Sequence, residues 1–316
     1  MAAVDRDQFV EHPPHPLASE LLENLALHRR PLLPKLPRIH EGHFTHTVVK
    51  LMNEFCEAID GDAPDEEAAF DAFSKLLLLS QRVLSVSAHR GARNPDRKKR
   101  RRQAIDSLLK MERKDLAYAA FQDVNGDLPI DDVLVDDDTR AVRLAKFYGI
   151  STGCLSKALR ALESAGVHAV DPTDASADSV FNKLEALHPQ HPAIEAADVP
   201  EVPDDAEFVN FTIDSISSAI SAFKRNGASP GLDGWRPEYL LTVLRVGKEA
   251  ATEAFVRFFT ILGNAELPLS VLTLLTGASL IPLVKPDGGV RPIAILPLFA
   301  KVTEKVLLYQ LPITDA

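Results

Sequence analysis

The chain is poor in cysteine and in aromatic residues, and it has no long uninterrupted apolar stretch. Its 316 residues include only two cysteines, Cys56 and Cys154, and 6% aromatic residues. Two cysteines so far apart exclude a disulfide-stapled scaffold and favour a reducing compartment. No apolar run approaches the ~18 residues of a membrane-spanning helix, and the N-terminus lacks the basic and then apolar regions of a secretory signal. We expect an intracellular protein without a membrane partner.

Charge is unevenly distributed along the chain. The net charge is −10, but residues 208–316 carry ten basic and nine acidic side chains, so the negative charge belongs to the first 207 residues. Within that acidic part, eight Lys or Arg lie between Arg90 and Arg102. Such a run is typical of a solvated loop, of a nucleic-acid phosphate contact or of a nuclear-import signal, and we expect a nuclear location. The candidate nucleic-acid contacts are Arg97, Lys98, Lys99, Arg100, Arg101 and Arg102.

Hydrophobic spacing and the distribution of proline predict a mostly α protein with a small β-hairpin, an α+β chain. Apolar residues at helical spacing predict helices over about 45–59, 66–86 and 103–121, a helix from Thr212 and a long helix after residue 236. The predicted parts are an irregular Pro-rich N-terminus (1–40), a helical extension with the basic run (41–187), an acidic Pro-rich linker (188–207) and a C-terminal segment (208–316).

The C-terminal segment contains two apolar runs on either side of Asp287-Gly288-Gly289, which predicts a hairpin over 279–296. Lys285 and Arg291 flank the reversal. A two-residue loop places these cations on opposite faces, whereas a three-residue loop pairs them on one face with Cβ atoms ~5 Å apart. A paired arrangement suits a shared anion such as a triphosphate. The alternative is an edge hairpin whose exposed positions happen to be basic.

Three turn signals crowd into residues 226–234, just before Trp235 and a predicted helix. A Gly-rich loop before a helix presents backbone N–H groups to an anion, although this one has neither dinucleotide-fold nor P-loop spacing. Trp235 either stacks on a base or anchors the turn against the core.

Taken in order, these elements resemble the fingers of a non-LTR retrotransposon reverse transcriptase, a right-hand polymerase. The family has a Pro-Gly-x-Asp-Gly turn before a helix, then a strand ending near Pro-Lys, a short turn to Arg-Pro-Ile, and a helix with Lys and Glu-Lys. The matching residues are Pro230, Gly231, Asp233, Gly234, Ile281, Pro282, Lys285, Gly289, Arg291, Pro292, Ile293, Lys301, Glu304 and Lys305.

The resemblance implies that Lys285 and Arg291 bind the dNTP phosphates. It also implies RNA template or RNA/DNA hybrid as a partner of a polymerase that has its palm. The template strand would be supported by the turn and the helix that follows it, with Pro230, Gly231, Asp233, Gly234 and Arg236.

Nucleotidyl transfer in this family requires two Mg²⁺ ions held by palm carboxylates, which lie C-terminal to the Arg-Pro-Ile strand. This sequence ends soon after that strand, and the double Asp at 136–137 is more simply a solvated loop. We therefore expect a truncated reverse transcriptase that binds no cofactor and does not polymerise by itself. Without a palm, an apolar surface would be free to bind another protein, and we expect it to include Leu296, Leu298, Phe299 and Leu307.

Two further patterns lie upstream. Residues 143–167 predict a helical pair that would place Ser156, Lys157 and Arg160 in a major groove if it were a DNA-binding helix-turn-helix. A nucleic-acid-binding or scaffold protein using this pair and the basic run is the alternative function. The same segment and the Leu-x-x-Leu-His-Pro after it also resemble the region preceding the polymerase in retroelement proteins. His40, His43 and His46, with Cys56, are more simply surface histidines than a zinc site, because no CxxC pair accompanies them.

Overall fold

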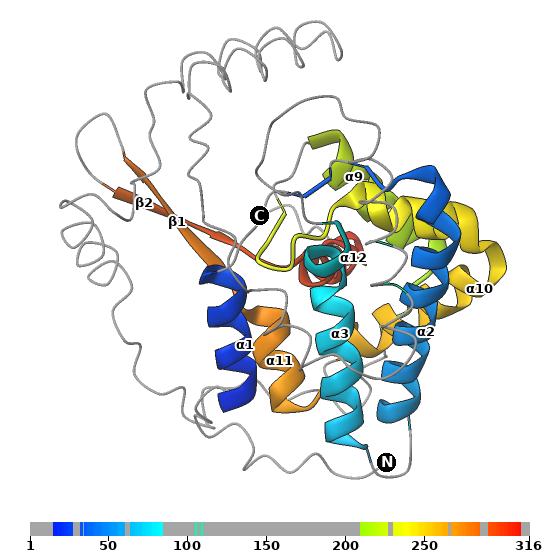
Figure 1. Cartoon of the computed structure of the whole chain (residues 1–316), viewed down its shortest axis with the longest axis horizontal. Helices are drawn as coiled ribbons and strands as arrows, with labels where there is room; N and C mark the ends of the chain where they lie inside the picture. The colour runs from blue at the N-terminus through cyan, green and yellow to red at the C-terminus, as the bar shows by residue number, and fades with distance from the viewer. Residues whose placement is uncertain are drawn as a thin grey trace, which may run out of the picture. The chain divides into compact units, whose positions relative to one another are not determined.

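The computed structural model describes residues 15–27, 32–33, 35–60, 64–84, 105, 109, 209–226, 230–264, 267–284 and 290–310. Within this part the chain is mostly helical with one two-stranded antiparallel sheet, which confirms the prediction of a mostly α chain with a small β-hairpin. The elements are α1 (Pro16–Leu27), η2 (Arg38–His40), α2 (Glu41–Ile59), α3 (Glu66–Leu84), α9 (Ile213–Asn226), α10 (Pro237–Gly263), α11 (Leu269–Thr276), β1 (Ser279–Val284), β2 (Val290–Ile295) and α12 (Leu298–Gln310) (Figure 1).

The chain divides into two compact units. The first comprises Met1–Leu128, Ala193–Ser279 and Ile295–Ala316, and the second comprises Pro129–Pro192 and Leu280–Ala294. All the helices named above belong to the first unit, whereas almost the whole hairpin belongs to the second. The linker predicted at 188–207 lies outside the described residues.

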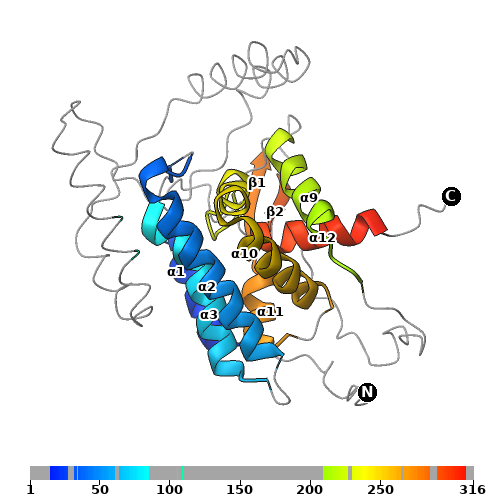
Figure 2. The same ribbon diagram turned by 90° about the vertical axis from the view of Figure 1, so that its right-hand side faces the viewer.

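In the first unit, helices from the two ends of the chain pack on one another. Helix α2 contacts both α3 and α10, and α9 lies against α10 and α12 (Figure 2). Helix α11 also belongs to this group of packed helices, because it contacts α1, α3 and α12. The predicted extension and the C-terminal segment therefore share one continuous hydrophobic core.

Helix starts follow local capping chemistry. The Asp65 carboxylate accepts a hydrogen bond from the Ala68 amide at 3.0 Å, so α3 begins at Glu66 as predicted. Before α9, Thr212 and Ser215 exchange side-chain to backbone hydrogen bonds, each 3.2 Å long, in a reciprocal capping arrangement. These bonds satisfy amides that have no partner inside the helix.

The sequence predicted an irregular N-terminus over residues 1–40, but this prediction is wrong for Pro16–Leu27, which form α1. Ala18, Leu21 and Leu25 are buried, and their spacing of three and four residues gives α1 one apolar face. Pro16 opens the helix at a position where a missing N–H has no cost. The helix was missed because the proline content of this segment favoured an irregular chain, although proline is also common at the first position of a helix.

Helix α10 is kinked at Lys248, whose φ of 48° and ψ of −125° are not helical. Lys248 is the one non-glycine residue of the described part with a positive φ. At the preceding Gly247, an added Cβ would lie 2.6 Å from the Cβ of Ala251 and 2.9 Å from Cγ2 of Thr45. The glycine therefore allows α10 to approach α2 closely at the kink.

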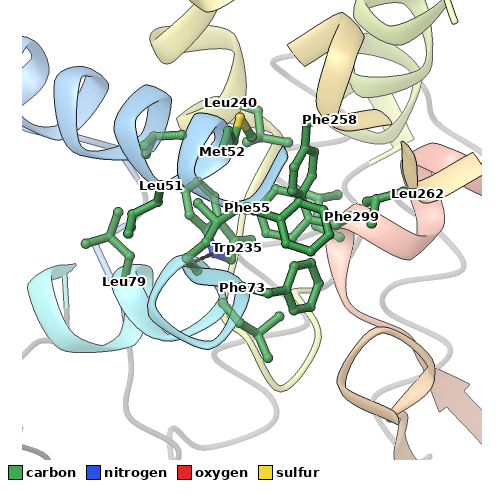
Figure 3. Close-up of a cluster of buried hydrophobic side chains, with 14 of the residues drawn as sticks. Leu51, Met52, Phe55, Phe73, Leu79, Trp235, Leu240, Phe258, Leu262 and Phe299 are labelled. Carbon is green, nitrogen blue, oxygen red and sulfur yellow. Dashed lines mark hydrogen bonds between the residues drawn. The ribbon is translucent and has the colours of Figure 1, made fainter. Parts of the chain in front are cut away.

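Aromatic rings from four elements form the centre of this core (Figure 3). The ring centroid of Phe299 in α12 lies 5.1 Å from that of Trp235 and 5.5 Å from that of Phe258 in α10. Phe73 of α3 lies 6.5 Å from Phe299 and 5.4 Å from Phe55 of α2. The cluster thus joins residues of the predicted extension to residues of the C-terminal segment.

The prediction of an uncovered apolar surface is wrong for two of its four residues. Leu298 and Phe299 are 2% and 0% exposed, because the aromatic cluster covers the start of α12. Leu296 and Leu307 are half-buried against the same core. The large exposed apolar side chains of α12 are instead Leu308 and Tyr309.

No helix in the described ranges has the length and the apolar character that crossing a membrane requires.

Candidate functional site

The predicted hairpin is present, with β1 ending at Val284 and β2 beginning at Val290. Arg291 is the second residue of β2 and is exposed, as is Ile293 two residues further along the same face of the strand. Lys285 follows β1 directly in the sequence but lies outside the described residues. The pairing of the two cations, and with it the choice between a two- and a three-residue loop, stays a prediction.

Both ends of the hairpin continue into closely packed segments of the first unit. Before β1, an added Cβ on Gly277 would lie 2.6 Å from Cδ1 of Leu22, so α1 packs directly against the end of α11. After β2, Leu296 and Pro297 lead into α12, and Pro297 is buried. We call Leu296–Leu298 the root of the hairpin.

The root lies against the predicted template-supporting turn. The Gly234 amide donates a hydrogen bond to the Gly231 carbonyl at 3.1 Å, and Gly234 has a φ of +70° that favours glycine. An added Cβ on Gly231 would lie 2.5 Å from the carbonyl oxygen of Leu296. This turn therefore requires glycine at both positions, once for conformation and once for close approach to the root.

Helix α3 holds the other side of the turn. The Ser80 hydroxyl donates a hydrogen bond to the Asp233 carbonyl, and the Gln81 amide donates one to the Leu232 carbonyl at 3.2 Å. Both side chains are buried, and residues from Gly231 to Trp235 are buried too. The middle of the turn is thus an internal connection, and a supporting role toward a template would have to be indirect or use the half-buried Pro230 and Arg236.

The Asp233 carboxylate bridges two backbone amides. Its Oδ1 accepts a hydrogen bond from the Trp235 amide at 3.3 Å, and its Oδ2 accepts one from the Leu298 amide at 3.0 Å. Leu298 is the first residue of α12, so Asp233 caps that helix from a distant part of the sequence. A carboxylate with no exposed surface is therefore stabilised by donors at a helix N-terminus.

Trp235 anchors the turn, which confirms one of its two predicted roles. Its side chain is fully buried, and its Nε1 donates a hydrogen bond to the Leu76 carbonyl at 3.0 Å. Its ring also packs against those of Phe44 and Tyr239, with centroids 5.7 and 6.3 Å away. The indole is consequently unavailable to stack on a base.

Arg236 precedes α10 and lies close enough to Tyr239 for its charge to act on the phenol. The Tyr239 hydroxyl donates a hydrogen bond to the Leu33 carbonyl. Burial raises the pKa of Tyr239 to about 12, although the Arg236 charge opposes this shift. Arg236 is thus half-buried beside Tyr239 rather than projecting freely toward a strand of nucleic acid.

The histidines do not all lie at the surface as predicted. His40 is fully buried at the end of η2, because the chain turns there into the apolar face of α2, whereas His43 and His46 are exposed. Burial raises the pKa of the Cys56 thiol to about 12, which disfavours the thiolate that a metal binds. The described ranges contain no group of three His, Cys, Asp or Glu side chains that could hold a metal ion.

The remaining sequence candidates lie outside the described residues. They are the basic run Arg97–Arg102, the helical pair at 143–167 and the double Asp at 136–137. Sequence reasoning missed the bridging role of Asp233, although apolar Leu232 and Trp235 beside it signalled a buried turn. In comparisons with known proteins, no family model, no curated protein and no solved structure matched the chain.

Proposed function

We propose that residues 208–316 are the fingers portion of a retroelement reverse transcriptase and that the hairpin binds the triphosphate of an incoming dNTP. The supporting observation is an antiparallel hairpin that presents an exposed Arg291 one residue after its reversal, with Lys285 on the other side of that reversal in the sequence. The proposed role is electrostatic. Guanidinium and ammonium groups neutralise phosphate charge without taking part in bond formation.

The difference between the exposed Arg291 of the hairpin and the engaged polar groups of the turn also supports the proposal. The polar groups of the turn are engaged inside the protein, by Ser80, Gln81 and the amides that Asp233 caps. Arg291 has exposed side-chain surface that can meet a ligand. The proposal therefore assigns ligand contact to the hairpin, while Gly231, Asp233 and Gly234 maintain the structure of the first unit.

The test is direct binding of a fluorescent dGTP analogue with Mg²⁺ to the chain itself. Charge-assisted hydrogen bonds contribute about 1.5–3 kcal/mol each, so Arg291→Ala and Lys285→Ala should each raise the Kd about tenfold or more. Unlabelled triphosphate should compete, because the recognised group is the phosphate chain. The matched control is Arg225→Ala, which removes another exposed cation, from the last turn of α9.

An unchanged Kd in Arg291→Ala, or an equal loss in Arg225→Ala, would refute specific binding at the hairpin. Nucleotide-independent binding of RNA that is lost on replacing Lys98–Arg101 by Ala would instead favour the alternative function, a nucleic-acid-binding protein that uses the basic run.

A further inference from the structure

We propose that Asp233 is a positioning residue: together with α3 it fixes the root of the hairpin, where β2 ends, and so restrains the strand that carries Arg291. This inference rests on the proposed function for the role of Arg291, but the fixation itself does not. The root and the turn both belong to the first unit, in which their contacts are described.

The connection runs without a break from α3 to the root. Ser80 and Gln81 bind two successive carbonyls of the turn, those of Asp233 and Leu232. The Asp233 carboxylate then binds the Leu298 amide at 3.0 Å. Trp235 adds a third link to α3 through the Leu76 carbonyl at 3.0 Å. Each of these groups is buried, so water does not compete for the bonds.

Close contact at Gly231 reinforces the same connection. The Leu296 carbonyl carbon would lie 2.9 Å from an added Cβ on Gly231, and the Pro297 Cα 3.0 Å from it. Backbone atoms cannot move aside as the end of a flexible side chain can. The root is therefore held by a hydrogen bond at Leu298 and by backbone packing at Leu296 and Pro297, on consecutive residues.

Few backbone groups between β2 and α12 are able to form a hydrogen bond that holds the root in place. Pro297 has no N–H, so it cannot contribute a backbone donor, and the Leu298 amide lies at the start of α12, where no helical carbonyl precedes it. The side chain that satisfies the Leu298 amide comes from Asp233, sixty-five residues earlier in the chain. Loss of one carboxylate oxygen should therefore loosen the root more than the rest of the unit.

Asp233→Asn is the test variant, because an amide has the same shape but only one acceptor oxygen and places an NH₂ group against one of the two amides. Hydrogen exchange should become at least tenfold faster at residues 290–298 than at α2 in the same protein, relative to wild type. The matched control is Leu51→Ala in α2, which removes buried volume away from the turn and should not accelerate residues 290–298 selectively. Equal acceleration of both regions in Asp233→Asn would overturn the proposal.

Two additional measurements separate this proposal from the proposed function. If Asp233→Asn does not fold, Ser80→Ala removes one hydroxyl and should give the same selective acceleration, and its absence would equally overturn fixation of the root. Nucleotide binding is then measured with the fluorescent dGTP analogue. A raised Kd in Asp233→Asn with no such rise in Leu51→Ala supports positioning of Arg291. Should wild type not bind nucleotide, the proposed function fails while hydrogen exchange still decides whether Asp233 fixes the root.

Discussion

Replacing Phe299 by alanine should destabilise the helices from both ends of the chain together. The side chain is fully buried and its ring lies near those of Phe73, Trp235, Phe258 and Phe259, at centroid distances of 6.5, 5.1, 5.5 and 6.4 Å. Phe-to-Ala changes in such cores cost about 3–5 kcal/mol. Because whole domains are stable by about 5–15 kcal/mol, we expect a loss of about 4 kcal/mol to remove a large part of the stability.

The assay is urea unfolding followed by two probes. Trp235 is the single tryptophan of the chain and lies beside Phe299, so its fluorescence reports on the core near α12. Far-UV circular dichroism reports on all helices, including α2 and α3. In wild type and in Phe299→Ala the two transitions should coincide, because one hydrophobic core joins the helices that they monitor.

Phe299→Leu serves as the control for volume, and it should cost less than about 1.5 kcal/mol since most of the apolar bulk remains. The reasoning would be refuted by a fluorescence transition that shifts in Phe299→Ala while most of the dichroism transition stays in place. Such a result would mean that the extension has a core of its own.

Three further predictions concern single positions. Gly231→Ala should destabilise the protein by about 1–3 kcal/mol in a urea titration, because the added Cβ meets backbone atoms. The control Gly42→Ala has open space around its Cβ and should stabilise α2 by about 0.5–1 kcal/mol. Equal effects of the two substitutions would contradict the close approach at Gly231. Lys248→Gly should raise the Tm, because it relieves about 1–3 kcal/mol of backbone strain at the positive φ of this residue. The control Glu249→Gly, one residue further on, should lower the Tm. A lower Tm in both variants would disprove backbone strain at Lys248. Since burial raises the pKa of Tyr239 from 10.0 to about 12, its contribution to stability is complete below pH 10 and is lost as pH rises toward 12, so the unfolding free energy should fall over that range. Tyr239→Phe should flatten this fall, and an unchanged slope would remove the phenol from the account.

The sequence predicted elements well where one local pattern dominated. Val48, Met52, Phe55 and Ile59 repeat at helical spacing, and α2 forms there, beginning at Glu41 rather than near Thr45. The hairpin formed where apolar runs flank Asp-Gly-Gly. Local signals of this kind depend on neighbours within one or two turns, which a sequence displays directly.

The site was harder to predict because its interactions are distant in sequence. The Asp233 side chain could be expected in a turn, but its bond to Leu298 and the bonds from Ser80 and Gln81 depend on how α3, the turn and α12 pack. Helix α11 was also missed, because Leu269–Thr276 has no charged residue to mark a polar face. Only tertiary structure distinguishes such an apolar helix from a strand.

The shared core has a consequence for how the protein is made. Translation proceeds from the N-terminus, so α2 and α3 leave the ribosome well before α9, α10 and α12, with residues 85–208 synthesised in between. At about 5–20 residues per second this interval is on the order of ten seconds. Throughout that time Phe55 and Phe73 lack their packing partners, because Phe258 and Phe299 have not yet been synthesised. The nascent α2–α3 pair should therefore be a substrate for ribosome-associated chaperones, and a stalled chain ending before residue 209 should retain them.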